Sequence, residues 1–287
     1  MIKTLLAALF ITAVALGGPA VAQTASPTLS KIKAAKAINV AYSPDSLPFS
    51  FNGPNNEPVG YSIDLCKRAI AQIGRAVGEP GLKINWIAGS VGERLQLVSS
   101  GRAELECANT TQTQSRLANV DFSNLIFVDG AGLLVKAGAA IDQFSDLAGK
   151  RIAVLKGTTT ETRLNDLLKS RLVNATVVVI TAANEGVALL EAGSVDAYAA
   201  DKIKLVGLAV QAKDPSKLAL VNEDFSFEPY AMALPRNDGA FRLEVNKALT
   251  QIYVGGDIEG IFAQWLGKLG RPTGLLAAMY LLNSIPD

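Results

Sequence analysis

The residues best suited to bind a small charged molecule lie at and after the end of a predicted strand at residues 103–107. They lie in the segment Glu106-Cys107-Ala108-Asn109-Thr110-Thr111-Gln112-Thr113-Gln114-Ser115-Arg116. The turn after a strand can direct hydroxyls and backbone N–H groups at one point. An arginine can hold a carboxylate through two parallel hydrogen bonds, which a lysine cannot. The segment therefore predicts a carboxylate site, the alternative being a helix-capping threonine followed by a surface arginine.

Two later segments have a similar character. Lys156-Gly157-Thr158-Thr159-Thr160-Glu161 lies between a predicted strand and a predicted helix, where a helix N-terminus leaves N–H groups unpaired. Asp201 ends an apolar strand, where its carboxylate can face a cleft and neutralise an ammonium group. The alternative for both segments is an ordinary N-cap, in the second case for a helix that begins at Lys202.

The elements that must position these residues alternate along the chain. Strands are predicted over 37–42, 84–88 and 103–107, and then over 151–155, 175–181, 195–199 and 230–234. Helices are predicted over 62–77, 93–99, 159–168, 185–191, 241–253 and 257–266, from apolar residues at steps of three and four. This pattern indicates an α/β fold. Because the rhythm restarts near residue 145, it predicts two lobes with a ligand cleft between them.

The composition excludes several classes of function. The chain of 287 residues contains no histidine, so Ser-His-Asp and Cys-His catalysis and histidine-based zinc sites are impossible. We expect no metal and no cofactor. The 27 basic residues nearly balance the 26 acidic ones, so no basic field favours nucleic acid or anionic lipid.

The N-terminal residues predict the compartment. Lys3 precedes an apolar run from Leu5 to Leu16, and Ala20-Val21-Ala22 has the small-residue pattern read by signal peptidase. We expect residues 1–22 to be a cleaved signal peptide and the mature protein to be free in the periplasm. In that oxidising compartment Cys66 and Cys107 could form a disulfide, the alternative being two buried thiols.

Taken in order, the three polar segments resemble those of the family 3 periplasmic solute-binding proteins of amino-acid ABC transporters, and within them the glutamate/aspartate-binding group. The likeness runs from about residue 36 to 285. Further support comes from the stretches Leu47-Pro48-Phe49-Ser50-Phe51, Val59-Gly60-Tyr61-Ser62-Ile63-Asp64-Leu65, Asp121-Phe122-Ser123 and Leu282-Asn283-Ser284-Ile285-Pro286.

The resemblance implies a type II periplasmic-binding-protein fold with two lobes and two crossover hinge strands. We expect lobe 1 to comprise residues 23–128 and 231–287, and lobe 2 to comprise residues 129–230. It also implies a monomer that closes its lobes around an amino acid and delivers it to the permease and ATPase of an importer.

The resemblance assigns roles to individual residues. Arg116, Thr111 and Thr159 would hold the ligand's α-carboxylate, and Asp201, with Thr111 and Asn109, would hold its ammonium group. Arg94, with Ser90 nearby, matches an arginine that pairs with the side-chain carboxylate of an acidic ligand. Three positions depart from the pattern: Ser43 replaces a second arginine, Glu185 stands where histidine can occur, and Asn109 replaces a serine.

These departures keep more than one ligand in view. We expect glutamate or aspartate, with a polar neutral amino acid as the alternative if Glu185 faces the cleft. A second alternative is an enzyme resembling the periplasmic cyclohexadienyl dehydratases, with Glu185 as its general acid. A third is a receptor that signals through a membrane partner without supporting uptake.

Overall fold

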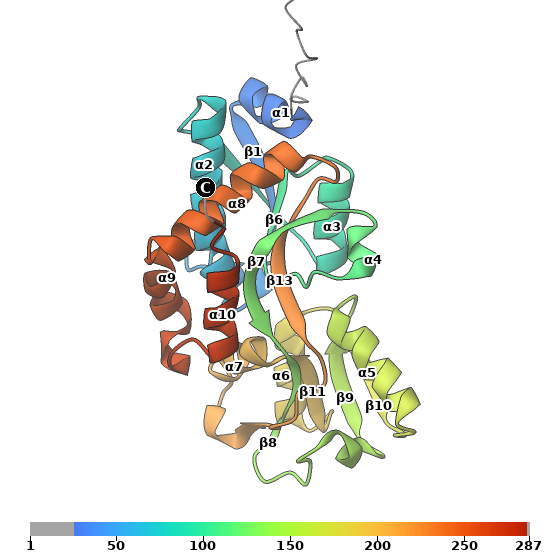
Figure 1. The fold of residues 1–287 in the computed structure, drawn as a ribbon. Coiled ribbons are helices and arrows are strands. Elements are labelled where there is room, and N and C mark those ends of the chain that lie inside the picture. Colours follow the sequence, from blue (N-terminus) through green and yellow to red (C-terminus); the bar gives the residue numbers. More distant parts are fainter. Residues whose placement is uncertain (1–25, 286–287) are drawn as a thin grey trace, which may run out of the picture.

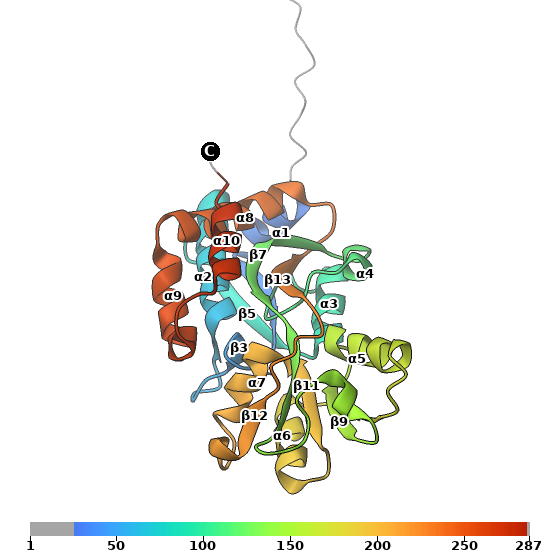
Figure 2. The same cartoon turned by 60° about the horizontal axis from the view of Figure 1, so that its bottom comes forward.

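The computed structural model describes residues 26–285 and contains two five-stranded sheets, each covered by helices on both faces (Figure 1). The predicted signal peptide lies outside the described residues. We call the part built on the first sheet lobe 1 and the part built on the second sheet lobe 2. Figure 2 shows lobe 2 below lobe 1, with the segments that join them running side by side.

The sheet of lobe 1 has the order β5-β1-β6-β13-β7. Its strands are β5 (Lys83–Ala88), β1 (Ala37–Tyr42), β6 (Leu105–Cys107), β13 (Glu228–Leu234) and β7 (Asp121–Asp129). The first three are parallel, and β13 runs antiparallel to both β6 and β7. The helices of this lobe are α1 (Pro27–Ala35), α2 (Tyr61–Val77), α3 (Val91–Ser99), α4 (Gln114–Leu117), α8 (Gly239–Val254), α9 (Asp257–Leu266), η3 (Gly267–Leu269) and α10 (Gly274–Leu282).

The sheet of lobe 2 has the order β10-β9-β11-β8-β12. Its strands are β10 (Thr176–Ile180), β9 (Arg151–Leu155), β11 (Ala197–Asp201), β8 (Ala131–Lys136) and β12 (Leu218–Leu220), and its helices are η1 (Phe144–Leu147), α5 (Thr159–Ser170), α6 (Ala183–Ala192), α7 (Lys202–Ala209) and η2 (Pro215–Lys217). A small third sheet, absent from the sequence prediction, is formed by β2 (Asp45–Ser46), β3 (Ser50–Asn52) and β4 (Pro58–Val59).

The central strands, such as β6 and β11, are buried on both faces, because alternate side chains enter different cores. In β11, Ala197 and Ala199 belong to one apolar cluster, and Tyr198 and Ala200 belong to another. In lobe 1 the helix α2 buries Ile63, Cys66, Ile70, Ile73 and Val77, the residues whose spacing predicted it. At the C-terminus, Leu276, Met279 and Tyr280 of α10 also enter the lobe 1 core.

The chain passes between the lobes twice, at residues 129–131 and 220–228, which confirms the two crossover segments. The strands of the first sheet fall within 37–129 and 228–234 and those of the second within 131–220. The predicted lobe boundaries lie close by, at 128–129 and 230–231. Glu228 of β13 pairs with Asp129 of β7, so both residues stand at the crossing between the lobes.

Cys66 and Cys107 form a disulfide, with 6.0 Å between their Cα atoms. The bond joins the middle of α2 to the last residue of β6. It therefore ties down the strand from which the segment containing Asn109, Thr111 and Arg116 emerges.

Candidate functional site

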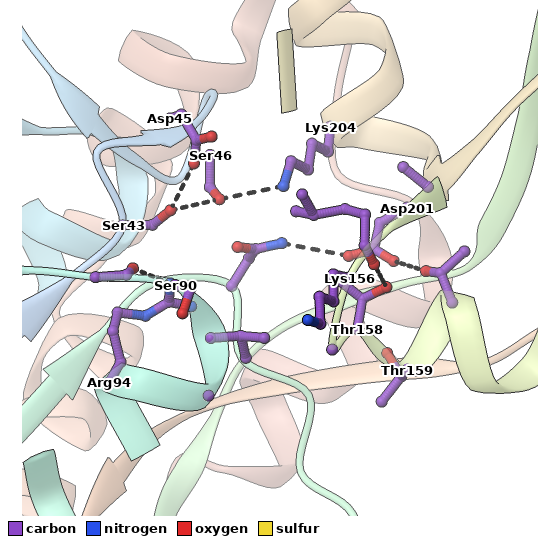
Figure 3. A pocket seen from close by; sticks show the side chains of 18 of the residues that line it. Ser43, Asp45, Ser46, Ser90, Arg94, Lys156, Thr158, Thr159, Asp201 and Lys204 are labelled. Atoms are coloured by element: carbon purple, nitrogen blue, oxygen red, sulfur yellow. Dashed lines mark hydrogen bonds between the residues drawn. The ribbon is translucent and has the colours of Figure 1, made fainter. Parts of the chain in front are cut away.

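A cavity of about 760 Å³ lies where loops of both lobes meet (Figure 3). Its walls come from residues after the carboxyl ends of parallel strands, which is the edge where open α/β sheets commonly bind ligands. Lobe 1 contributes residues 43–46, 88–94, 109, 111 and 116, and lobe 2 contributes residues 155–160, 181–182, 199–201 and 204. Of the nine predicted ligand-binding residues, the cavity brings together all except Glu185.

Arg116 lies in the short helix α4, whose first turn is capped by the Thr113 hydroxyl. Its Nη1 donates to the carbonyl of Thr111 at 2.7 Å. Within residues 26–285 its guanidinium makes no ion pair, and burial lowers its pKa below the ordinary arginine value. The remaining N–H groups can therefore receive a carboxylate that enters the cavity.

Asp201 is the last residue of β11 and is 8% exposed. Its carboxylate accepts hydrogen bonds from Tyr230 Oη at 2.6 Å, Thr160 Oγ1 at 3.0 Å and Asn109 Nδ2 at 3.2 Å. It makes no capping bond to α7; Asp129 accepts from the Ile203 N–H of that helix instead. Asp201 thus occupies the N-cap position of α7, as the alternative interpretation expected, but its carboxylate does not cap the helix.

Two further carboxylates lie behind Asp201 at the crossing between the lobes. Burial and the neighbouring Asp201 raise the pKa of Asp129 to about 7. Burial and the nearby Glu228 carboxylate likewise raise the pKa of Asp201 above the ordinary aspartate value. This concentration of negative charge favours a cation in front of Asp201.

Glu228 connects the two lobes through hydroxyl groups. Its Oε2 accepts from Thr111 Oγ1 of lobe 1 at 2.6 Å and from Thr159 Oγ1 of lobe 2 at 2.7 Å. Both hydroxyl protons are thus directed at the same carboxylate oxygen. The threonine oxygens then offer lone pairs, which suit an ammonium group better than a carboxylate.

Three consecutive threonines at the start of α5 have three different partners. Thr158 is the N-cap and accepts from the Glu161 N–H, as the ordinary interpretation of the segment expected. Thr159 donates to Glu228, and Thr160 donates to Asp201. The same segment therefore caps a helix and lines the cavity.

Arg94 is only 4% exposed and is already occupied within lobe 1. Its Nε donates to Glu106 Oε1 at 2.7 Å, and its other nitrogens donate to Gly89 O at 2.9 Å and Thr110 Oγ1 at 3.3 Å. Because Glu106 is fully buried, the pair is an internal ion pair. Arg94 lines the cavity but does not enter it as an unpaired cation.

Ser90 and Ser43 also line the cavity with hydroxyls that have partners. Ser90 is the N-cap of α3 and forms a capping box with Glu93. The Ser43 hydroxyl lies 2.8 Å from Ser46 Oγ and 3.1 Å from Asp45 Oδ1. The cation expected at position 43 in the glutamate/aspartate-binding group is thus replaced by a hydroxyl cluster.

Glu185 lies outside the cavity. It is exposed in the first turn of α6, where its carboxylate accepts from the Thr181 N–H at 3.2 Å. The expectation that this residue contacts a ligand is not met, because the side chain folds back onto its own helix terminus.

Sequence reasoning missed two contacts that join the lobes near the cavity. Asp45 of lobe 1 accepts from the Ala183 N–H of lobe 2 at 3.0 Å. Lys204 of lobe 2 is 5% exposed and donates to Ser46 Oγ of lobe 1 at 3.3 Å. Lys204 could have been noticed, since it is a charge within the apolar run Ile203-Lys204-Leu205-Val206.

Other classes of site find no support in the described part of the chain. Residues 26–285 contain no group of three or more acidic, histidine or cysteine side chains arranged to hold a metal ion. None of the helices in this range is both long and apolar enough to cross a membrane.

Comparisons with known proteins agree with this geometry. Residues 38–268 match the family described as bacterial extracellular solute-binding proteins, family 3. The chain is 32% identical over 266 residues to an L-glutamate/L-aspartate-binding protein of Pseudomonas aeruginosa, covering 92% of this chain and 88% of the relative. It is 30% identical over 254 residues to a glutamate/aspartate import solute-binding protein of Escherichia coli, covering 88% and 84%.

A solved structure gives the same result for the fold. The crystal structure of an ancestral amino acid-binding protein, a precursor of cyclohexadienyl dehydratase, superposes with a TM-score of 0.73 at 25% identity, covering 83% of this chain and 99% of that one. The family match extends over both lobes and all the cavity loops. The chain therefore belongs to the bacterial extracellular solute-binding proteins of family 3.

Proposed function

We propose that this protein is the periplasmic receptor of an amino-acid ABC importer and that it closes its lobes around glutamate or aspartate. One observation carries the proposal. Arg116 of lobe 1, which has no carboxylate partner in the described chain, and Asp201 of lobe 2, which lies among buried carboxylates, line the same cavity. A zwitterion supplies each of them with the opposite charge, as groups removed from water require.

The arrangement also supports a sequence of events. The ligand's α-carboxylate meets Arg116 on lobe 1, and its ammonium group meets Asp201 and the threonine oxygens once lobe 2 has turned inward. Ligand binding then shifts the population toward the closed form, which the membrane permease and ATPase recognise. The names of the relatives in Pseudomonas aeruginosa and Escherichia coli favour an acidic ligand.

The remaining parts of the proposal concern location and assembly. Export by a signal peptide at residues 1–22 is in keeping with the extracellular character of the family. We also propose that the receptor acts as a monomer, as the family resemblance implies.

Calorimetric titration of Arg116→Ala tests the assignment. A micromolar ligand binds with about −8 kcal/mol, and truncating Arg116 is expected to remove about 2–5 kcal/mol by leaving the ligand's carboxylate unpaired. Arg75→Ala is the matched control, since this exposed arginine of α2 bonds only Gln72. If Arg116→Ala binds amino acids as tightly as the parent protein, the assignment is wrong.

An enzyme on the same scaffold is the second candidate, because the ancestral precursor of cyclohexadienyl dehydratase shares the fold. The acid considered for that chemistry was Glu185, which is exposed and outside the cavity. This placement favours the receptor. Incubation with prephenate or arogenate distinguishes the two, since an enzyme forms an aromatic product and a receptor leaves the substrate unchanged.

A further inference from the structure

At one wall of the cavity a buried lysine of lobe 2 meets two serines of lobe 1 (Figure 3). Lys204 Nζ donates to Ser46 Oγ at 3.3 Å, and Ser46 Oγ lies 2.8 Å from Ser43 Oγ. An ammonium group has three N–H donors, yet in the described chain only this long bond engages one of them. No carboxylate among residues 26–285 lies within ion-pair distance of this ammonium, although its side chain is almost completely buried.

The acidic groups near Lys204 are occupied elsewhere. Asp45 accepts from the Ser43 hydroxyl and from the Ala183 N–H, and Asp201 accepts from Tyr230, Thr160 and Asn109. Burial lowers the pKa of Lys204, with Asp45 and Asp201 acting in the opposite direction. A carboxylate placed beside this ammonium would therefore relieve an unfavourable burial of charge.

The other cations of the cavity do not compete for this role. Arg94 is neutralised by Glu106, and the Lys156 side chain is exposed at the rim. Arg116 and Lys204 are then the two inward cations without a carboxylate partner in the described chain. One suits the α-carboxylate of an amino acid, and the other suits a second carboxylate.

We propose that Lys204 selects an acidic side chain, with its ammonium pairing with the ligand's distal carboxylate beside the Ser43 and Ser46 hydroxyls. The inference rests on the proposed amino-acid receptor and names the residue that determines its ligand class. It gives a reason for the departure at Ser43: a cation from lobe 2 occupies the region that an arginine of lobe 1 was expected to fill.

Calorimetric titrations of the parent protein and of Lys204→Met with glutamate and glutamine test the proposal. Methionine keeps the length of the buried chain and removes the charge. Glutamate binding is expected to weaken about 30-fold or more, because its distal carboxylate loses its partner. Glutamine binding is expected to change less than threefold, since its amide carries no charge.

Lys202→Met is the matched control. Lys202 lies on the same helix but pairs with Asp224 outside the cavity, so its replacement should leave both ligands unaffected. Adding Ser43→Arg to Lys204→Met is expected to restore at least tenfold of the lost glutamate affinity, because position 43 is one hydroxyl away from the missing ammonium. Thermal unfolding verifies that each variant is folded, and Lys204→Gln replaces the methionine variant if that one is not.

The outcomes separate this proposal from the proposed function. A parent protein that binds no amino acid contradicts the receptor itself. A parent that binds glutamine more tightly than glutamate keeps the receptor and overturns the role of Lys204. Equal losses for glutamate and glutamine in Lys204→Met would show a purely structural lysine and would also overturn it.

Discussion

The first turn of α6 in lobe 2 receives its cap from lobe 1. Ala182 occupies the N-cap position and has no side-chain acceptor, and the Ala183 N–H donates to Asp45 Oδ2 at 3.0 Å. A helix N-terminus without an acceptor leaves N–H groups unsatisfied. Because donor and acceptor come from different lobes, this bond can exist only while the lobes are together.

Replacing Asp45 by alanine should therefore weaken the binding of every ligand that requires closure. A capping side chain contributes about 1 kcal/mol, within a range of about 0.5–2. Because this hydrogen bond exists only in the closed state, its loss destabilises that state alone by about 1 kcal/mol, which lowers the apparent ligand affinity about fivefold.

The matched variant is Asp45→Asn, which removes the same charge but keeps an oxygen that can accept from Ala183. Any electrostatic effect on Lys204 or on the ligand is common to both variants and cancels in their ratio. Titration of each variant with glutamate and glutamine should give a dissociation constant about five times larger for Asp45→Ala than for Asp45→Asn, with either ligand. Equal affinities of the two variants would refute the reasoning, and so would a ratio that depends on the ligand.

Two further predictions concern stability. The pKa of Asp129, raised to about 7, means that the native protein keeps a proton there which the unfolded chain releases near pH 4, so stability from this group is full below pH 4 and is lost as the pH rises to 7. The unfolding free energy that Asp129→Asn gains over the parent should be about 2.5 kcal/mol larger at pH 8 than at pH 5, since asparagine keeps an acceptor for Ile203 and does not ionise. Urea unfolding at both pH values measures this, and an equal gain would contradict it. Reducing the disulfide between Cys66 and Cys107, which are 41 residues apart, should remove about 4 kcal/mol and lower Tm by roughly 10 °C. Differential scanning calorimetry with and without reductant checks this, with the Cys66→Ser/Cys107→Ser variant as the control that reductant should not affect; an unchanged Tm would be contrary evidence.

The sequence alone was sufficient to predict the position of residues that follow strands. Arg116, Thr159 and Asp201 were predicted to lie near one another because polar segments at or soon after the end of a strand lie at a sheet edge, whatever the details of packing. The helix over 62–77 was predicted to within one residue of α2, since its apolar spacing is fixed by its buried face.

Partners distant in the chain could not be predicted in this way. Glu228 is more than a hundred residues from Thr111, and the antiparallel return of β13 beside β7 brings it within hydrogen-bond distance of that hydroxyl. The pairing of Arg94 with Glu106 was not predicted, because the sequence does not show that α3 packs against β6. Glu185 was misplaced because its helix turns that position outward, and the rotation of a helix depends on the core it covers.

The position of Glu228 has a consequence for how the ligand specificity of the receptor would change while it continues to bind amino acids. Two lobes that rotate about a hinge move least beside that hinge. Glu228 lies at the hinge, and one of its carboxylate oxygens accepts a hydrogen bond from a hydroxyl of each lobe. The part of the ligand common to all amino acids would be held there. Ser43 and Lys204 line a different wall of the cavity, so substitutions there would change which ligand side chain is accepted and leave the contacts to the common part of the amino acid unchanged.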